Sequence, residues 1–363
     1  MIDSSTAERT RDLTGVTEAP GASLRDVVER FIRERLVDRR ALSVSAPRRL
    51  GGGNSMENWA FDVGWDEGDG RRELPLLLRR EPEMGVVDTS RDAEFRLLEL
   101  LSDTDVPVAR ALWNDDGTTF GRPSMIVERR QGTAHRGVLR DADPLGLGES
   151  GRLGLAADFI DLLATVHAVD VDAMNVGAIL PLPDPDPGRS QLDHWTTELD
   201  RVEREPQPAL RFTARWLRDH LPPPPDRLAL VHGDFRPANV LLHDGRIEVL
   251  LDWELAHVGD PVDDLGWYTC SIYTREHLLP GRWEVDEVLD RYRRKTGVDD
   301  IDLDRLHFWQ VMSTFRLAVM ALTGVAAFLD GGTDRPAAPP GRLTRQALLD
   351  TGLVTASVPR SAR

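Results

Sequence analysis

The sequence is poor in cysteine. Cys270 is the only cysteine among 363 residues, so no disulfide can form within the chain, and a scaffold held together by disulfides is excluded. Such scaffolds are typical of secreted proteins, whereas a lone thiol fits a reducing compartment. We therefore expect a cytoplasmic protein.

The sequence also lacks an uninterrupted apolar run of transmembrane length. The most apolar long stretch, Phe308 to Leu329, is interrupted by polar side chains and by Arg316, and an arginine at the centre of a bilayer is costly. We expect this stretch to form a buried helix and expect no membrane partner. Residues 1–22 are polar and have no apolar core of signal-peptide type, so they are predicted to be a disordered tail, and residues 358–363 are expected to form a C-terminal tail.

The chain has fewer basic than acidic side chains. The chain carries 45 lysine and arginine residues against 61 aspartate and glutamate residues, for a net charge of −16. Nucleic-acid binding draws on basic side chains that displace counterions from phosphates, so a nucleic-acid partner is not expected. An acidic balance can steer a basic substrate, but it is more often a means of staying soluble.

The pattern of apolar residues changes along the chain, and the length suits two subdomains that share a cleft. The first part alternates short strands with two helices, and the part from about Gly132 onward is mostly helical. This pattern predicts the α+β class. The predicted segments are a helix opened by a capping box at Ser23 and Asp26, strands at Trp59–Val63 and Leu74–Leu78, a helix at Asp92–Leu101, apolar segments at Ala109–Trp113 and Ser124–Val127, and helices at Leu153–Val169, Leu192–Val202, Leu210–His220 and Val285–Lys295.

One block of residues carries recognisable chemistry. A short apolar strand, Leu228 to Val231, leads into His232-Gly233-Asp234, and Asn239 follows five residues after Asp234. The same spacing occurs in the kinase catalytic loop, where the aspartate accepts the proton of a substrate hydroxyl and the asparagine holds a metal ion. His232 is expected to anchor this loop by hydrogen bonds rather than to bind a metal.

A β-hairpin is predicted directly after this block. Asp244-Gly245 is typical of a type I′ turn, and pairing outward from it sets Val240 opposite Val249. Asn239 and Asp252 then emerge together at the open end, and a Mg²⁺ ion needs such a convergence of oxygen ligands. The alternative is a chance hairpin after an ordinary turn, but the five fixed identities would arise by chance in about one chain in ten thousand.

These residues, with Trp253-Glu254 and with the run from Gly259 to Leu265, resemble the aminoglycoside phosphotransferase-like family of kinase-fold enzymes. The resemblance extends from about Leu50 to Leu329. It implies a protein-kinase-like two-lobe fold with a small antiparallel-sheet N-lobe over residues 23–131, which binds the nucleotide. It also implies a mainly helical C-lobe over residues 132–357, which carries the catalytic loop and the substrate-binding helices.

The resemblance also implies roles in the C-lobe. Asp234 would be the catalytic base, Asn239 and Asp252 would bind Mg²⁺, and Asp264 would brace the catalytic loop from behind. Asp260, which precedes Pro261, is expected to cap a helix rather than to take part in catalysis.

In the N-lobe the resemblance implies a turn over the phosphates formed by Gly52, Gly53 and Ser55, although glycines in a strand turn are more often structural. A basic residue at the end of the following strand should pair with a helix glutamate, and Arg79 with Glu94 occupy those places.

Two N-lobe assignments depend on the register of a strand. Arg80 is adjacent to Arg79, and strand alternation puts the two on opposite faces, so either could contact phosphate. The segment after the last strand resembles the hinge between the lobes, which implies backbone contacts from Glu128 and Arg130 to adenine.

The activity implied is ATP- and Mg²⁺-dependent transfer of the γ-phosphoryl group to a hydroxyl of a small molecule by a monomer or homodimer. The alternative is a kinase-fold nucleotide-binding regulator or adaptor without transfer, and the intact Asp234, Asn239 and Asp252 argue against it. Protein kinase activity lacks support because Asp252-Trp253-Glu254 stands where kinases carry Asp-Phe-Gly. The acceptor stays open among aminoglycosides, sugars, amino alcohols and hydroxyacyl compounds.

Overall fold

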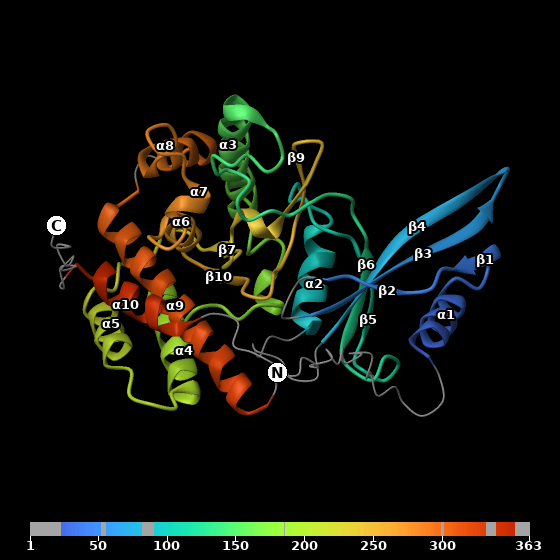
Figure 1. Cartoon of the computed structure of the whole chain (residues 1–363), viewed down its shortest axis with the longest axis horizontal. Coiled ribbons are helices and arrows are strands. Elements are labelled where there is room, and N and C mark those ends of the chain that lie inside the picture. Colours follow the sequence, from blue (N-terminus) through green and yellow to red (C-terminus); the bar gives the residue numbers. More distant parts are fainter. Residues whose placement is uncertain are drawn as a thin grey trace, which may run out of the picture.

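The computed structural model describes residues 23–51, 56–81, 91–184, 186–298, 301–331 and 339–352. A sheet lies at one end of the molecule and a body of helices at the other (Figure 1). The predicted α+β fold with a small antiparallel sheet and a mainly helical remainder is confirmed. The predicted tails, 1–22 and 358–363, lie outside the described residues, and the limits of the two lobes stay a prediction.

The N-terminal part is one antiparallel sheet with a helix on each face. Its strands run in the order β1-β3-β4-β6-β5, and β2 pairs with the edge of β3. The predicted strands and both predicted helices are present. The elements are α1 (Leu24–Arg35), β1 (Arg40–Val44), β2 (Arg48–Arg49), β3 (Glu57–Glu67), β4 (Gly70–Arg80), α2 (Arg91–Leu101), β5 (Ala111–Asp115) and β6 (Ser124–Glu128).

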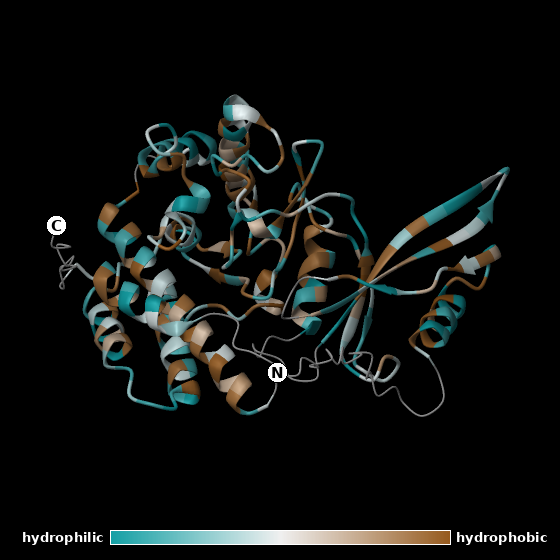
Figure 2. Cartoon of the chain, viewed as in Figure 1, coloured by the Kyte–Doolittle hydropathy of each residue, from teal (hydrophilic) through white to brown (hydrophobic). Residues whose placement is uncertain are grey.

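Alternation along β4 decides which side chain meets which helix. Leu76 and Leu78 point to the face covered by α1, where they join the core around Phe31. Leu77 points to the other face, where it packs against the large core that includes α2 and the helical body. Because side chains alternate in a strand, Arg79 shares the α2 face with Leu77. The far end of the β3–β4 hairpin is hydrophilic (Figure 2).

The C-terminal part is built of helices around two short two-stranded sheets, β7 with β10 and β8 with β9. The four helices predicted there are present. The elements are α3 (Gly148–His167), η1 (Val176–Ala178), α4 (Pro187–Val202), α5 (Pro208–Asp219), β7 (Ala229–Val231), η2 (Pro237–Asn239), β8 (Val240–His243), β9 (Arg246–Leu250), β10 (His257–Gly259), α6 (Val262–Thr269), α7 (Thr274–His277), α8 (Val285–Thr296), α9 (Leu303–Leu329) and α10 (Pro340–Asp350).

Helix α9 is the central helix of this part. By length and composition it is the one helix of the described residues that could span a membrane, but 72% of its most apolar window is buried inside the protein. Arg316 within it is 1% exposed and donates to Asp263 of α6 at 3.0 Å. The prediction of a buried helix is confirmed, and the burial of its apolar faces accounts for the composition.

The β8–β9 hairpin differs from the prediction by one residue. Asp244 and Gly245 have φ values of 50° and 74°, as a type I′ turn requires. However, an irregularity between Leu241 and Leu242 pairs Val240 with Leu250 instead of Val249. The predicted register is therefore wrong at the open end, because a β-bulge adds one residue to one strand.

Candidate active site

The loop that follows β7 is shaped by a glycine. Strand β7 pairs with β10, which sets Val231 opposite His257, and the chain then turns through Gly233 with a φ of 82°. A Cβ atom at this position would lie 2.3 Å from the carbonyl oxygen of Leu255. No other residue fits so close to a neighbouring backbone, and the tight turn delivers Asp234 to the end of the strand.

Asp264 holds this loop by hydrogen bonds to its backbone. Its carboxylate accepts hydrogen bonds from the backbone N–H groups of His232 at 2.7 Å and Gly233 at 2.9 Å, and it contacts His167 Nε2 at 3.1 Å. Burial alone would raise the pKa of this fully buried carboxyl, but the contacts with His167 and His232 lower it to about 2. Asp264 is thus an ionised anchor under the loop.

His232 ties the two halves of the site together. Its Nε2 contacts the carbonyl oxygen of Leu251 at 2.9 Å, and its Nδ1 accepts from the backbone N–H of Asp234 at 3.2 Å. The ring also lies against Trp253, with 4.7 Å between centroids. The imidazole therefore links the loop after β7 to the segment after β9.

Asp234 lies at the centre of the site and is 6% exposed. The amide Nδ2 of Asn239 donates to its Oδ2 at 2.8 Å and to its backbone carbonyl at 2.9 Å. Arg236 Nε lies 2.9 Å from Oδ1. The role of Arg236 as a partner of Asp234 was missed from the sequence, because an arginine two residues along a loop has no spacing that marks it.

Asp252 is held next to Asn239 by the backbone. The N–H of Leu251 donates to the carbonyl of Asn239 at 2.7 Å, and Asp252 then takes a φ of 66°. A non-glycine residue in the left-handed region is strained, and such strain concentrates at functional sites. The structure thus brings Asp234, Asn239 and Asp252 together, as the sequence predicts.

The carboxylates around Asp252 suit the binding of a cation. Asp252 Oδ1 is buried and has no hydrogen-bond partner among the described residues. Burial, together with the neighbouring carboxylates of Asp234 and Glu94, raises the pKa of Asp252 despite Arg79. In the same region burial and the charge of Asp252 raise the pKa of Glu254 to about 7. A bound cation would relieve this excess of buried carboxylates.

A metal ion here would have few protein ligands. Within the described residues no group of three or more His, Cys, Asp or Glu side chains could hold a metal ion. Asn239 uses Nδ2 for both of its contacts with Asp234, so its Oδ1 takes no part in them. Mg²⁺ is commonly bound by one or two carboxylates together with substrate phosphates, so this donor set fits Mg²⁺ bound with a nucleotide.

Arg79 brings the sheet to the same site. Its Nη1 donates to Glu94 Oε1 of α2 at 2.6 Å. Burial would lower the pKa of Arg79, but the carboxylates of Glu94, Asp252 and Glu254 raise it overall, so the guanidinium is within electrostatic reach of carboxylates from both parts of the chain. Arg80 points to the other face and donates to Glu57 Oε2 at 2.7 Å. The pair at the site is therefore Arg79 with Glu94.

The structure says less about the other N-lobe residues that are predicted to contact the nucleotide. Gly52, Gly53 and Ser55 lie outside the described residues. Glu128 ends β6 and its N–H donates to the carbonyl of Arg110 at 2.9 Å. The side chain of Arg130 pairs with Glu248 of β9, with Nε 3.0 Å from Oε1. These positions join the sheet to the helical part, and adenine contacts stay a prediction.

Helix α6 begins one residue later than predicted, so Pro261 takes the N-cap position and Asp260 lies one residue before it. The helix begins at Val262 instead of Pro261, and Asp260 Oδ1 accepts from the N–H of Val262 at 3.0 Å. Its Oδ2 accepts from Trp309 Nε1 at 3.0 Å. Asp260 therefore fixes α6 to α9 and makes no contact with Asp234.

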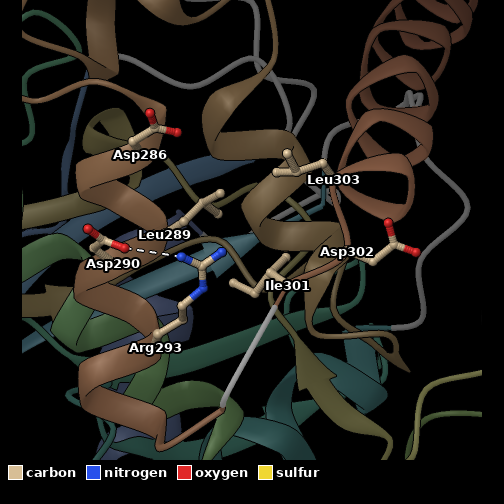
Figure 3. A pocket seen from close by; sticks show the side chains of 7 residues that line it. All are labelled: Asp286, Leu289, Asp290, Arg293, Ile301, Asp302 and Leu303. Atoms are coloured by element: carbon tan, nitrogen blue, oxygen red, sulfur yellow. Dashed lines mark hydrogen bonds and ion pairs between the residues drawn. The ribbon is translucent and has the colours of Figure 1, made fainter.

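A cavity of about 540 Å³ lies elsewhere, between α8 and the start of α9 (Figure 3). Asp290 and Arg293 form an ion pair at its wall, with 3.1 Å between Oδ1 and Nη1. None of the candidate site residues lines it. We assign no role to this cavity.

An arginine from a strand of the small sheet meets a helix glutamate, and the helical body presents Asp234, Asn239 and Asp252. This is the arrangement of kinase-like phosphotransferases. A sequence model of the phosphotransferase enzyme family matches residues 47–309, and the chain belongs to that family. This confirms the relationship predicted from the motif.

The curated relatives carry the name of a different activity. Acyl-CoA dehydrogenase family member 10 of Mus musculus is 30% identical over 268 residues, which cover 69% of this chain but 24% of that protein. The chain thus spans about a quarter of the length of this curated relative.

Two solved structures share the fold. A candidate aminoglycoside phosphotransferase of Ralstonia eutropha superposes with a TM-score of 0.68 and 22% identity, covering 90% of this chain and 97% of that one. The aminoglycoside phosphotransferase APH(4)-Ia, in complex with AMP-PNP and hygromycin B, gives a TM-score of 0.54 and 20% identity over 90% and 99% of the chains. At these identities the likeness shows the fold.

Proposed function

We propose that this chain is an ATP- and Mg²⁺-dependent phosphotransferase that moves the γ-phosphoryl group to a hydroxyl of a small molecule. The observation that carries the proposal is the contact of Asn239 with the Asp234 carboxylate, with Asp252 alongside and Arg79 facing them. This set has a base for the hydroxyl proton, oxygen ligands for a cation and a guanidinium for phosphate. We expect a cytoplasmic monomer or homodimer.

The proposed roles follow from the contacts. Asp234 orients the acceptor hydroxyl and accepts its proton as the new O–P bond forms and the bond from the γ-phosphorus to the leaving ADP oxygen breaks. Asn239 and Arg236 fix the direction of the Asp234 carboxylate, so little reorganisation is needed. Mg²⁺, held by Asn239 and Asp252, would neutralise phosphate charge. Arg79, steadied by Glu94, would contact the phosphates that are not transferred.

The proposal names the acceptor only as a class of small molecules that carry a hydroxyl group. One solved neighbour binds hygromycin B, and a curated relative is named for acyl-CoA dehydrogenation. His307, Phe308 and Trp309 in the first turns of α9 resemble the C-terminal aromatic helix of family members that accompany acyl-CoA metabolism. A panel of acceptors should therefore contain aminoglycosides, sugars, amino alcohols and hydroxyacyl compounds.

The test is transfer of labelled phosphate from Mg-ATP to this panel and to a metabolite extract. Removing the base with Asp234→Asn should lower kcat by about 10²–10⁴-fold, the usual contribution of a general base. Binding of AMP-PNP should stay within about twofold of the wild type. Asp219→Asn, a change at a half-exposed carboxylate on α5, is the matched control and should leave both values unchanged.

Two outcomes would contradict the proposal. Wild-type protein that binds ATP tightly and transfers phosphate to no acceptor would instead be a nucleotide-binding module. Transfer that survives in Asp234→Asn at the wild-type rate would remove Asp234 from the mechanism.

A further inference from the structure

Two arginines outside the motif converge on one carboxylate near the catalytic loop. Arg136 Nη2 lies 2.5 Å from Glu276 Oε1 and its Nε lies 3.2 Å from Oε2, so it engages both oxygens. Arg140 Nη2 lies 2.7 Å from the same Oε1. The Glu276 side chain is 10% exposed, whereas those of Arg136 and Arg140 are 63% and 44% exposed. The guanidinium groups thus cover a buried carboxylate and face solvent.

Arg236 extends this cluster to the catalytic aspartate. Its contacts with Asp234 are made by Nε. Its Nη1 and Nη2 groups have no hydrogen-bond partner among the residues described by the structure. The side chain is 30% exposed, so these donors remain available to a ligand next to Asp234.

Short helix α7 connects Arg236 to the other two arginines. Burial raises the pKa of Tyr273, and the charges of Asp234, Arg236 and Glu276 act on the same hydroxyl. Burial, together with the charges of Arg236 and Arg136, lowers the pKa of His277 to about 4 despite the nearby Glu276 carboxylate. One short segment is therefore within electrostatic reach of both Arg236 and Arg136.

Stacked rings make the connection rigid. The ring of His277 stacks on Tyr268 at 4.5 Å and on Tyr273 at 4.8 Å between centroids. Phe235, which follows Asp234, lies 6.0 Å from Tyr268. The arginine cluster (Arg136, Arg140 and Arg236) is thereby fixed relative to Asp234 through packed aromatic side chains.

The charges in the cluster do not cancel. Three guanidinium groups contact two carboxylates, those of Glu276 and Asp234, so these contacts leave one positive charge over, and Asp252 acts on Arg236 from farther away. The excess arises in a chain whose net charge is −16. Guanidinium groups bind carboxylates and phosphates with two parallel hydrogen bonds, so free donors here favour an anion.

We propose that the arginine cluster binds an anionic group, a carboxylate or a phosphate, carried by the acceptor molecule. This rests on the proposed phosphotransferase function, and it deepens that function by naming the charge of the substrate. The anion would lie against Arg136 and Arg140, and Arg236 would contact it from the side of Asp234. A hydroxyl of the same molecule then reaches the Asp234 carboxylate.

The competing explanation is structural. Arg136 and Arg140 precede α3 and could serve only to tie their segment to α7 through Glu276. Although both arginines are exposed, the Glu276 carboxylate is 10% exposed, so replacing both arginines leaves a buried charge without a partner and lowers stability in either case. A purely structural role would change the melting temperature alone, whereas a binding role also changes KM for the acceptor.

The first experiment separates a metabolite extract by anion and cation exchange and measures Mg-ATP-dependent phosphorylation in each fraction. We expect products from the anionic fraction. Arg136→Gln/Arg140→Gln should lower the melting temperature, because Glu276 loses both partners, and should also raise KM for that acceptor at least tenfold with KM for ATP nearly unchanged. Arg215→Gln on α5, 75% exposed, is the matched control. Products from neutral or cationic fractions alone, or an unchanged KM, would overturn the inference and leave the proposed function standing.

The second experiment does not depend on turnover. Asp234→Asn protein saturated with Mg-AMP-PNP is titrated with inorganic phosphate, followed by ³¹P line broadening, and with 3-hydroxybutyrate, followed by saturation-transfer NMR. The two probes distinguish a phosphate site from a carboxylate site. Binding of either that is lost in Arg136→Gln/Arg140→Gln supports the anion site even where no transfer occurs, in which case only the phosphotransferase function fails. No binding of either probe contradicts the anion site.

Discussion

Arg79 and Arg80 are neighbours in β4 that serve different faces of the sheet. Arg79 meets Glu94 on the side of Asp252, and Arg80 meets Glu57, which also pairs with Arg122. A lost hydrogen bond to a charged group costs about 1.5–3 kcal/mol. Arg79→Ala should therefore raise KM for ATP by about tenfold or more, whereas Arg80→Ala should lower stability and leave KM for ATP unchanged. Steady-state kinetics and urea unfolding check both, and the opposite result would reverse the assignment.

Asp264 is the residue whose charge matters most for the loop. Its folded pKa of about 2 lies below the ordinary value of 3.8, so it stabilises the fold above pH 4, by about 2 kcal/mol. That contribution is lost as the pH falls from about 4 towards 2. Asp264→Asn should cost about 3 kcal/mol at pH 7, and its deficit relative to wild type should shrink near pH 2.5. Urea unfolding at several pH values measures this, and a deficit independent of pH would contradict it.

At the scale of elements, α6 and α9 cross unusually closely. A Cβ atom at Gly266 would lie 2.5 Å from Trp309 Cβ and 2.6 Å from its carbonyl carbon. Gly266→Ala must push the two helices apart, so we expect a loss of about 2 kcal/mol or more. Gly154→Ala in α3, where nothing lies within 4 Å of the new atom, should be neutral or stabilising by up to about 1 kcal/mol. Thermal unfolding compares them, and equal effects would contradict the close contact.

The elements also show what a sequence can predict. Local signals such as the Ser23 cap, the Asp244-Gly245 turn and the apolar composition of α9 depend on near neighbours, so these segments are found at or near their predicted places. The bulge at Leu241 depends on packing between strands and carries no local signal. The pair of Arg136 with Glu276 was missed for the same reason, because the contact joins residues 140 positions apart.

At the scale of the whole molecule, the site is assembled from two parts. The sheet supplies Arg79 and the helical part supplies Asp252 and Asn239, with α2 between them in Figure 1. Mg-AMP-PNP should thus raise the melting temperature more than AMP-PNP with EDTA. At a hundredfold excess over Kd, ligand binding contributes about 2.7 kcal/mol. Asp252→Ala should abolish the difference made by Mg²⁺, which differential scanning fluorimetry measures. A difference that persists would place the metal elsewhere, with Asp219→Asn as the control.

The pairing of Glu94 with an arginine has a practical consequence for chemical probes. Lys295 is the only lysine of the chain, and it lies on α8 with its Nζ 3.4 Å from Asp161. Acyl-phosphate derivatives of ATP and other amine-directed reagents, which label a kinase through its nucleotide-site lysine, have no amine to acylate beside Arg79. Occupancy of this site must instead be followed with dicarbonyl reagents that modify guanidinium groups, and proteome-wide surveys based on lysine acylation would overlook enzymes built in this way.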